Sequence, residues 1–221
     1  MERLLRAWNA LVFTAWATVP FLVAGIGWRR GWLHMAALAT AVIIHGRYVA
    51  RRNPALRERR SRIRVGTKRW DLWWNALFWP LLASVAVTAA LEVRGGRSPM
   101  PSWTCPLGIA LLAAGFALSA AAMAANPFFE GVVRIQREVG HRTIENGPYG
   151  RIRHPGYAGL ALWALATPLL LGFSWAFVPA LATVAWVVIR TALEDAILLR
   201  ELPGYTDYAR RVKQRLVPGL W

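Results

Sequence analysis

The sequence predicts an all-α integral membrane protein, a polytopic helical bundle of about six spans. Hydrophobic residues make up 56% of the 221 residues and include thirteen tryptophans, which exceeds the usual composition of a soluble domain. Apolar stretches of roughly 20 residues, the length that crosses a hydrocarbon core of about 30 Å, recur along the chain. Lysine and arginine crowd into the short segments beside these stretches, which is typical of cytoplasmic loops. Together these features predict a multi-pass membrane protein.

The basic composition favours membrane lipids over nucleic acid as partners. The formal charge is +16, from 27 lysines and arginines against 11 acids. A positive net charge suits binding to nucleic acid or to anionic lipids. The charges lie beside apolar spans rather than in a separate basic domain, which favours lipids. Cys105 is the single cysteine, which excludes an internal disulfide framework and a cysteine-rich zinc site. We therefore expect no nucleic-acid partner and no metal.

Four single spans are predicted before the middle of the chain, at residues 7–28, 32–49, 70–93 and 103–125. The basic stretch 47–69 should form a cytoplasmic loop against anionic headgroups. Trp70, Trp73, Trp74 and Trp79 at the start of the third span suit an interfacial aromatic belt. The fourth span is rich in alanine, glycine and serine, so it should pack closely in the bundle centre. His34 and His45 lie near opposite ends of the second span and are expected to pack rather than to share a metal.

The apolar run 157–189 is too long for one span, since a single helix would be about 50 Å long. A helical hairpin turning near residues 172–174 fits better, and it returns both ends to the cytoplasmic face. Both chain termini then lie on that face too, and the amphipathic segment after residue 199 should cover the membrane surface or cap a site. We expect residues 1–125 to anchor the protein and residues 126–221 to carry its chemistry.

Residues 141–157, HRTIENGPYGRIRHPGY, form a polar and aromatic stretch between apolar flanks. Pro155 suits the first position of a helix, where its missing N–H costs nothing, and it forces His154 into an extended conformation. The helix start that follows suits a carboxylate or phosphate. An alternative interpretation is that these residues form only a basic anchor at the membrane edge.

Ionisable residues gather at one predicted membrane face and mark a candidate site. They are His141, Arg153, His154, Arg190, Glu194 and Asp195. Arg190 and Glu194 are four residues apart, so simple pairing along one helix is the alternative interpretation. The chain has no Rossmann fingerprint, P-loop, nucleophile elbow or HExxH motif.

Over residues 126–221 the sequence resembles the isoprenylcysteine carboxyl methyltransferases and related membrane phospholipid methyltransferases. The resemblance rests on the ordered segments NPFF, RIQREVGH, GPYGRIRHPGY, RTALEDAILLRELPGYTDYARRV and RLVPGLW. It implies methyl transfer from S-adenosylmethionine, bound without a Rossmann domain in a pocket at the cytoplasmic helix ends.

The resemblance also implies roles for individual residues. Arg190 would hold the acceptor, and Arg190, Glu194 and His154 would form the catalytic set. The implied cofactor-binding residues are Gln136, His141, Arg142, Thr143, Ile144, Tyr149, His154, Pro155, Gly156, Tyr157 and Glu194. Two positions depart from the family pattern: the spacing from Gln136 to the next histidine is shorter than in eukaryotic members, and Asp195 stands where many relatives have a second glutamate.

The expected acceptor is an amphiphilic molecule with a carboxylate, such as an isoprenylcysteine. Carboxylate attack on a sulfonium methyl quenches opposite charges, so a desolvated pocket favours it and no general base is needed. Phosphatidylethanolamine amines and lipidic phenols are alternatives that need a proton removed, for which His154 and Glu194 are the nearest bases. A non-catalytic lipid-binding or scaffold protein is the alternative of another class. The sequence does not define the oligomeric state.

Overall fold

The computed structural model describes residues 2–54, 56 and 66–221. Within these residues the protein is helical, with no strand. The helices, in chain order, are α1 (Glu2–Ala24), α2 (Arg29–Arg52), α4 (Arg69–Arg94), α5 (Thr104–Ala125), η1 (Arg137–Val139), η2 (Gly147–Gly150), α6 (Pro155–Leu171), α7 (Phe177–Glu201) and α8 (Tyr205–Arg211). The predicted all-α class is therefore confirmed.

Four helices of the described chain, α2, α4, α5 and α7, are long and apolar enough to cross a membrane. Two shorter apolar stretches are the C-terminal part of α1, Thr14–Ala24, and α6. This confirms several apolar helices of membrane-spanning character, whereas six full spans remain a prediction. His34 packs edge-on against Trp16, and His45 packs edge-on against Phe116, as expected of packing histidines.

The predicted hairpin is present and turns at Gly172. Its φ of +81° is a left-handed conformation that glycine adopts without strain, and its N–H donates to the carbonyl of Pro168 to close α6. The second arm is longer than predicted, because α7 continues beyond residue 189 to Glu201. The charged residues that appeared to end the apolar arm are carried on the last turns of that helix.

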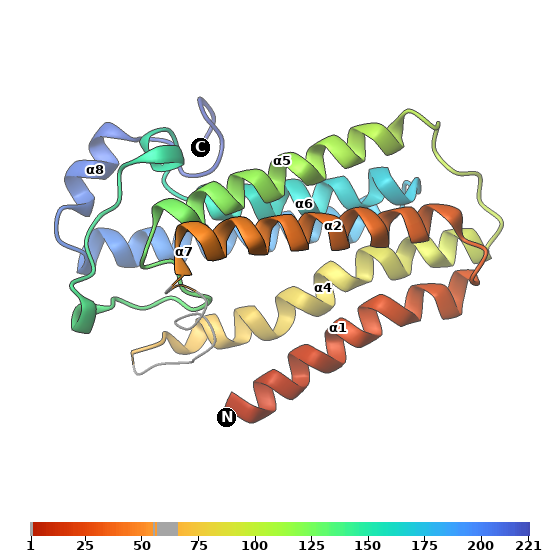
Figure 1. Cartoon of the computed structure of the whole chain (residues 1–221), viewed down its shortest axis with the longest axis horizontal. Helices are drawn as coiled ribbons and strands as arrows, with labels where there is room; N and C mark the ends of the chain where they lie inside the picture. Colours follow the sequence, from red (N-terminus) through yellow and green to blue (C-terminus); the bar gives the residue numbers. More distant parts are fainter. Residues whose placement is uncertain (1, 55, 57–65) are drawn as a thin grey trace.

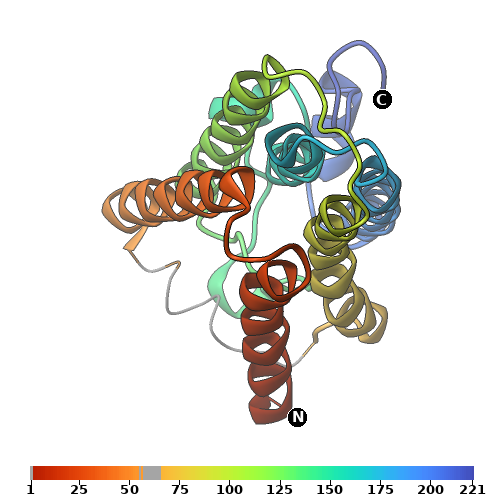
Figure 2. The same cartoon turned by 90° about the vertical axis from the view of Figure 1, so that its right-hand side faces the viewer.

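Helix α6 lies inside the bundle and contacts α2, α4, α5 and α7. Figure 2 shows it surrounded by these helices. Its closest neighbour is α5, because small residues let the two backbones approach. A Cβ added to Gly115 would lie 2.7 Å from the carbonyl oxygen of Gly159, and one added to Gly108 would lie 2.7 Å from the backbone nitrogen of Leu170. The close packing predicted for the fourth span is therefore confirmed in α5, but the central position predicted for it is occupied by α6.

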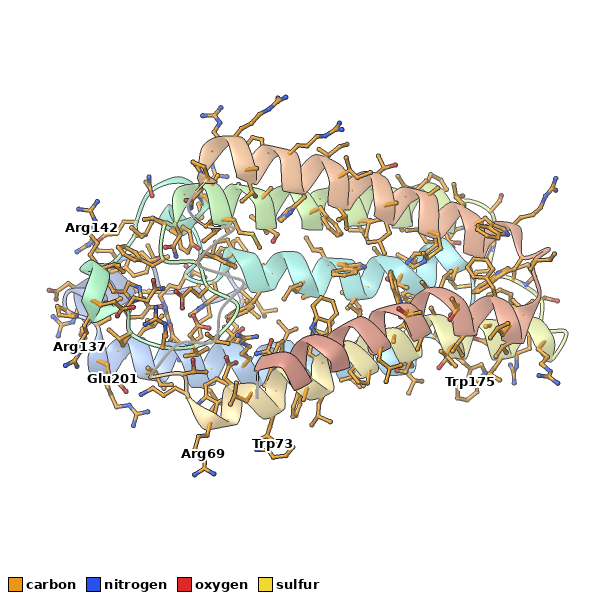
Figure 3. All side chains as sticks on the ribbon, turned by 60° about the horizontal axis from the view of Figure 1, so that its bottom comes forward. Arg69, Trp73, Arg137, Arg142, Trp175 and Glu201 are labelled. Carbon is orange, nitrogen blue, oxygen red and sulfur yellow. The ribbon has the colours of Figure 1, made fainter. Side chains whose placement is uncertain are left out.

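Two expectations for the first half need correction. Residues 47–52 were expected in a loop but continue α2, whose last turn carries Arg51 and Arg52 where positive charge favours a helix C-terminus. Much of the rest of the basic stretch, at 55 and 57–65, lies outside the described residues. The aromatic belt is also divided: Trp73 is 73% exposed and points outward (Figure 3), whereas Trp74 is buried.

The two ends of the bundle differ in content. In Figure 1 the short connections 25–28 and 95–103 lie at the right, while η1, η2 and α8 lie at the left. Figure 3 places Arg137, Arg142 and Glu201 at one end and Trp175 at the other. The segments that carry the sequence motifs thus meet at one end of the bundle.

Candidate functional site

A pocket opens at the motif-bearing end of the bundle. It lies between the segment after α5, the start of α6, the last turns of α7, and α8. Its lining residues are Asn126, Phe128, Phe129, Glu130, Val132, Val133, Arg134, Ile135, His141, Arg142, Thr143, Ile144, Tyr149, Arg153, His154, Gly156, Tyr157, Glu194, Ile197, Leu198, Leu202, Tyr205 and Tyr208. Four segments separated in sequence therefore build one concave surface.

Most residues that the sequence suggested for cofactor binding line this pocket. The exceptions are Gln136 and Pro155. Gln136 is 1% exposed and donates from Nε2 to the carbonyl of Phe128 at 2.6 Å, while its backbone N–H donates to Nδ1 of His141 at 3.3 Å. Gln136 thus supports the pocket wall from behind.

Pro155 takes the helix-starting position predicted for it, whereas His154 does not adopt the expected extended conformation, because its ψ is 60°. Pro155 is the first residue of α6, and His154 before it has a φ of −128°, outside the helical region. The backbone N–H of His154 donates to the carbonyl of Arg215 at 2.9 Å, and that of Arg153 donates to the carbonyl of Gln214 at 3.0 Å. The C-terminal segment therefore runs along the motif and caps this side of the site.

Asp195 is the buried centre of a charged network beside the pocket. Its side chain is 0% exposed, and it accepts hydrogen bonds from Arg153 at 2.8 and 2.7 Å and from Arg215 at 2.9 Å. Nε2 of His154 lies 3.0 Å away, and the hydroxyl of Tyr205 donates at 2.8 Å. Asp195, which the sequence placed in the ionisable cluster without a role of its own, thus joins α7 to the motif, α8 and the C-terminal segment.

Glu194 points to a different face of α7 from its neighbour Asp195 and lines the pocket. Adjacent helical residues are about 100° apart, so two consecutive acids can serve two surroundings. The hydroxyl of Tyr157 donates to Oε2 of Glu194, and the ring of His154 stacks beside that of Tyr157 at 5.8 Å. The carboxylate is therefore fixed at the start of α6.

Arg190 does not pair with Glu194 but with Asp71 of α4. Its Nη2 lies 3.0 Å from Oδ1 of Asp71 and donates to the carbonyl of Gly131 at 3.1 Å. The guanidinium stacks over Trp74 at 4.2 Å and over Tyr157 at 5.2 Å. Arg190 is 4% exposed and lies behind Tyr157 rather than in the pocket lining. The simple pairing along one helix is therefore wrong.

The sequence reasoning missed an acidic and basic pair in the pocket wall. Arg134 donates from Nε and Nη2 to Glu130 at 2.7 and 2.9 Å, and its Nη1 lies 2.7 Å from Glu138. Hydrogen bonding to Glu130 raises the pKa of Arg134. The spacing of four residues on each side of Arg134 was the available signal, although the segment is largely irregular rather than helical.

Burial sets the protonation of other pocket residues outside the apolar helices. It lowers the pKa of His141, whose ring packs against Phe128 at 4.6 Å, so this imidazole is neutral at neutral pH. It raises the pKa of Tyr149 and Tyr208, which stay protonated. Tyr208 donates its hydroxyl hydrogen to the carbonyl of Tyr149 at 2.8 Å and so ties α8 to η2.

The arrangement suits a cationic ligand with polar groups at its periphery. Glu194 supplies a carboxylate, and Phe128, Tyr149 and Tyr157 supply aromatic surface, whereas the charge of Glu130 is offset by Arg134. Carboxylates and aromatic faces both attract a positive charge in a partly desolvated site. A sulfonium compound matches these residues.

Comparison with known proteins agrees with the motif resemblance. Residues 107–200 match the model of the isoprenylcysteine carboxyl methyltransferase (ICMT) family. A rice (Oryza sativa subsp. indica) protein called probable protein-S-isoprenylcysteine O-methyltransferase is 33% identical over 105 residues, which cover 43% of this chain and 51% of the rice protein.

Two further relatives carry similar names. Protein-S-isoprenylcysteine O-methyltransferase B of Arabidopsis thaliana is 28% identical over 114 residues, covering 50% of this chain and 57% of that protein. The Schizosaccharomyces pombe protein-S-isoprenylcysteine O-methyltransferase is 39% identical over 54 residues, covering 24% of this chain and 23% of that protein. The chain spans about half the length of the plant relatives it matches.

Proposed function

Because residues 107–200 match the model of the isoprenylcysteine carboxyl methyltransferase family, we propose that this protein is an S-adenosylmethionine-dependent membrane methyltransferase. The proposed reaction is carboxyl O-methylation of an isoprenylcysteine or a similar lipidic acceptor. The observation that carries the proposal is the single pocket that gathers the motif residues His141, Tyr149, His154, Tyr157 and Glu194. Glu194 and the aromatic lining suit the sulfonium of the cofactor, and the arginines of the lining suit its carboxylate.

The pocket residues have distinct proposed roles toward the cofactor. At the start of α6 we assign the backbone N–H of Gly156 to the cofactor carboxylate, because Pro155 has no N–H and the N–H groups of Tyr157 and Ala158 donate to the carbonyl of His154. Glu194, held by Tyr157, faces the cationic part, and His154 is fixed by Asp195 as part of the wall. S-adenosylmethionine supplies the methyl group as an activated sulfonium.

Methylation of a carboxylate acceptor requires no proton transfer. A carboxylate oxygen forms the bond to the methyl carbon as the carbon–sulfur bond breaks, and the electron pair remains on sulfur, so no base is required. Exclusion of water favours this step, since solvent stabilises the separated charges that the reaction removes. We assign Arg190 to orienting the acceptor carboxylate, because a guanidinium binds carboxylates through paired hydrogen bonds.

The membrane frame is consistent with a lipidic acceptor. Four helices of spanning length surround α6, and the pocket lies at one end of the bundle. We propose that this end and both termini face the cytoplasm, that membrane lipids are partners and that nucleic acid is not. An amphiphilic acceptor would present its head group at the pocket while its tail remains in the bilayer.

The pairing of Arg190 with Asp71 gives one reason to retain a second acceptor class. A free arginine would repel a protonated amine, but an arginine whose charge is offset by a carboxylate 3.0 Å away repels it less. Phosphatidylethanolamine N-methylation is therefore the second candidate. An alkyl phenol has no such support in the structure.

The test combines cofactor binding with a panel of acceptors. Calorimetry in lipid or detergent should detect S-adenosylmethionine binding to the wild type, with severe weakening in Glu194→Ala and His154→Ala and unchanged binding in Glu92→Gln, a buried acid of α4 distant from the pocket. Absence of binding to the wild type would favour the scaffold alternative.

Labelled methyl transfer is then measured to a small farnesylated cysteine, phosphatidylethanolamine and an alkyl phenol. A base-labile product on the farnesylated cysteine identifies the ester, and Arg190→Ala should raise KM most for this acceptor. Labelling of phosphatidylethanolamine alone, with a rate that Arg190→Ala leaves unchanged, contradicts the carboxylate assignment and supports the amine.

A further inference from the structure

Asp71 lies in the first turn of α4, outside the residues that match the family. Its side chain is 0% exposed. Oδ1 lies 3.0 Å from Nη2 of Arg190, and Oδ2 accepts a hydrogen bond from the backbone N–H of Val133 at 2.7 Å. One buried carboxylate therefore links the N-terminal half of the chain to α7 and to the pocket wall.

The same helix end holds that wall by further bonds. The backbone N–H of Lys68 donates to the carbonyl of Val133 at 3.1 Å, and Nδ2 of Asn75 donates to the carbonyl of Gly131 at 3.4 Å. Asp71 is the member of this group whose charge is buried and reaches Arg190. A buried carboxylate is tolerated only with such partners.

Arg190 is anchored by one of its nitrogens. Both of its hydrogen bonds come from Nη2, to Asp71 and to the carbonyl of Gly131. Nε is buried and has no hydrogen-bond partner among the described residues. Leaving a buried donor unpaired costs roughly 1–3 kcal/mol, so a ligand that accepts this hydrogen bond recovers that cost. Trp74 and Tyr157 hold the guanidinium plane in place from its faces.

We propose that Asp71 is a positioning residue for acceptor recognition: it fixes Arg190 through Nη2 and leaves the remaining donors for the acceptor carboxylate. The inference rests on the proposed function and gives the N-terminal half a part in it. Asp71 touches neither cofactor nor acceptor and acts through Arg190.

Two substitutions distinguish the positioning of Arg190 by Asp71 from the support that Asp71 gives to Val133 in the pocket wall. Asp71→Asn keeps an oxygen for the N–H of Val133 but removes the charge that fixes Arg190. It should raise KM for the farnesylated cysteine about tenfold, the equivalent of 1.4 kcal/mol, with an unchanged Kd for S-adenosylmethionine. Asp71→Ala also removes the support of Val133 and should weaken cofactor binding as well.

A double-mutant cycle with Arg190→Gln tests whether Asp71 acts through the arginine. Asp71→Asn should have no further effect on acceptor KM in the Arg190→Gln background, whereas additive effects overturn the proposal. Glu92→Gln, which alters another buried acid of α4, should leave acceptor KM unchanged. If Asp71→Asn does not fold, Asp71→Glu replaces it, because it keeps the charge but moves the carboxylate by one methylene.

The outcomes distinguish the two claims. A wild type that binds no S-adenosylmethionine or does not methylate the farnesylated cysteine overturns the proposed function and this inference with it. An active wild type whose acceptor KM is unchanged by Asp71→Asn, or by Asp71→Glu in its place, overturns the role of Asp71 alone. A raised acceptor KM with unchanged cofactor Kd, lost in the Arg190→Gln background, supports it.

Discussion

The two ends of the bundle differ in the side chains that form hydrogen bonds where the apolar helices end. At the far end Arg30 donates to the carbonyls of Met100 and Pro101 and to the hydroxyl of Thr104, and the buried Glu92 accepts from the backbone N–H of Ala176. Around the pocket, buried carboxylates gather several cations and hydroxyls, with Asp195 alone bonded to two arginines, a histidine and a tyrosine. Both ends have polar backbone to satisfy, but the pocket end contains far more buried charge.

The pocket end therefore contains more buried charge than is needed to end the helices. Burying ions costs free energy, and the far end forms its turns with fewer buried ions than the pocket end. The excess of buried charge around Asp195 and Asp71 is therefore what we expect of the end proposed to bind ligands. Substitutions at the pocket end should change ligand binding, while those at the far end should change stability alone.

The largest effect is expected from Asp195→Asn. Loss of the carboxylate leaves Arg153 and Arg215 without their common partner, and breaking a buried ion pair costs about 3–5 kcal/mol. Unfolding in detergent should show this loss, and calorimetry should show no cofactor binding. A variant with wild-type stability and affinity would contradict the central place of Asp195 in the network.

A smaller effect is expected at the far end from Gly172→Ala. A side chain at φ +81° is strained by about 1–3 kcal/mol, and the new Cβ would collide with the guanidinium of Arg30. The free energy of unfolding should fall while the Kd for S-adenosylmethionine stays unchanged. A weaker affinity for S-adenosylmethionine would contradict the expectation that substitutions at the far end change stability alone.

The smallest effect concerns the pH dependence contributed by His141. Burial lowers its pKa below the ordinary value of 6.5, so the unfolded chain binds the proton more readily. Its contribution to stability is present at pH 7.5 and is lost as the pH falls below about 6.5. His141→Phe keeps a ring against Phe128 and should reduce the fall in the free energy of unfolding between pH 7.5 and 5.5. An identical fall in both proteins would contradict the burial of a neutral imidazole.

The helices were predictable because their signals are local. Apolar length indicated the spans, and Pro155 and Gly172 marked the start and end of the first hairpin arm. The end of α7 was missed because Arg190 and Glu194 are charged, although partners from other segments allow them to lie on an interior face. Local hydropathy carries no information about those partners.

The candidate site was predictable where family motifs specify it and not beyond. The pairing of Arg190 with Asp71 joins residues 119 positions apart, and no spacing rule connects them. Gln136 matched by order of motifs, yet its side chain is used within its own loop. The role of Asp195 required the path of the C-terminal segment, which only the folded chain defines.

The pairing of the motif backbone with Gln214 and Arg215 has a consequence for biosynthesis. These residues leave the ribosome after every helix from α1 to α7 has been made, so the bundle can insert before its pocket has a wall on that side. The pocket wall is then completed only after the helices have been made, and a chain that stops before Gln214 would be an anchored protein without this wall.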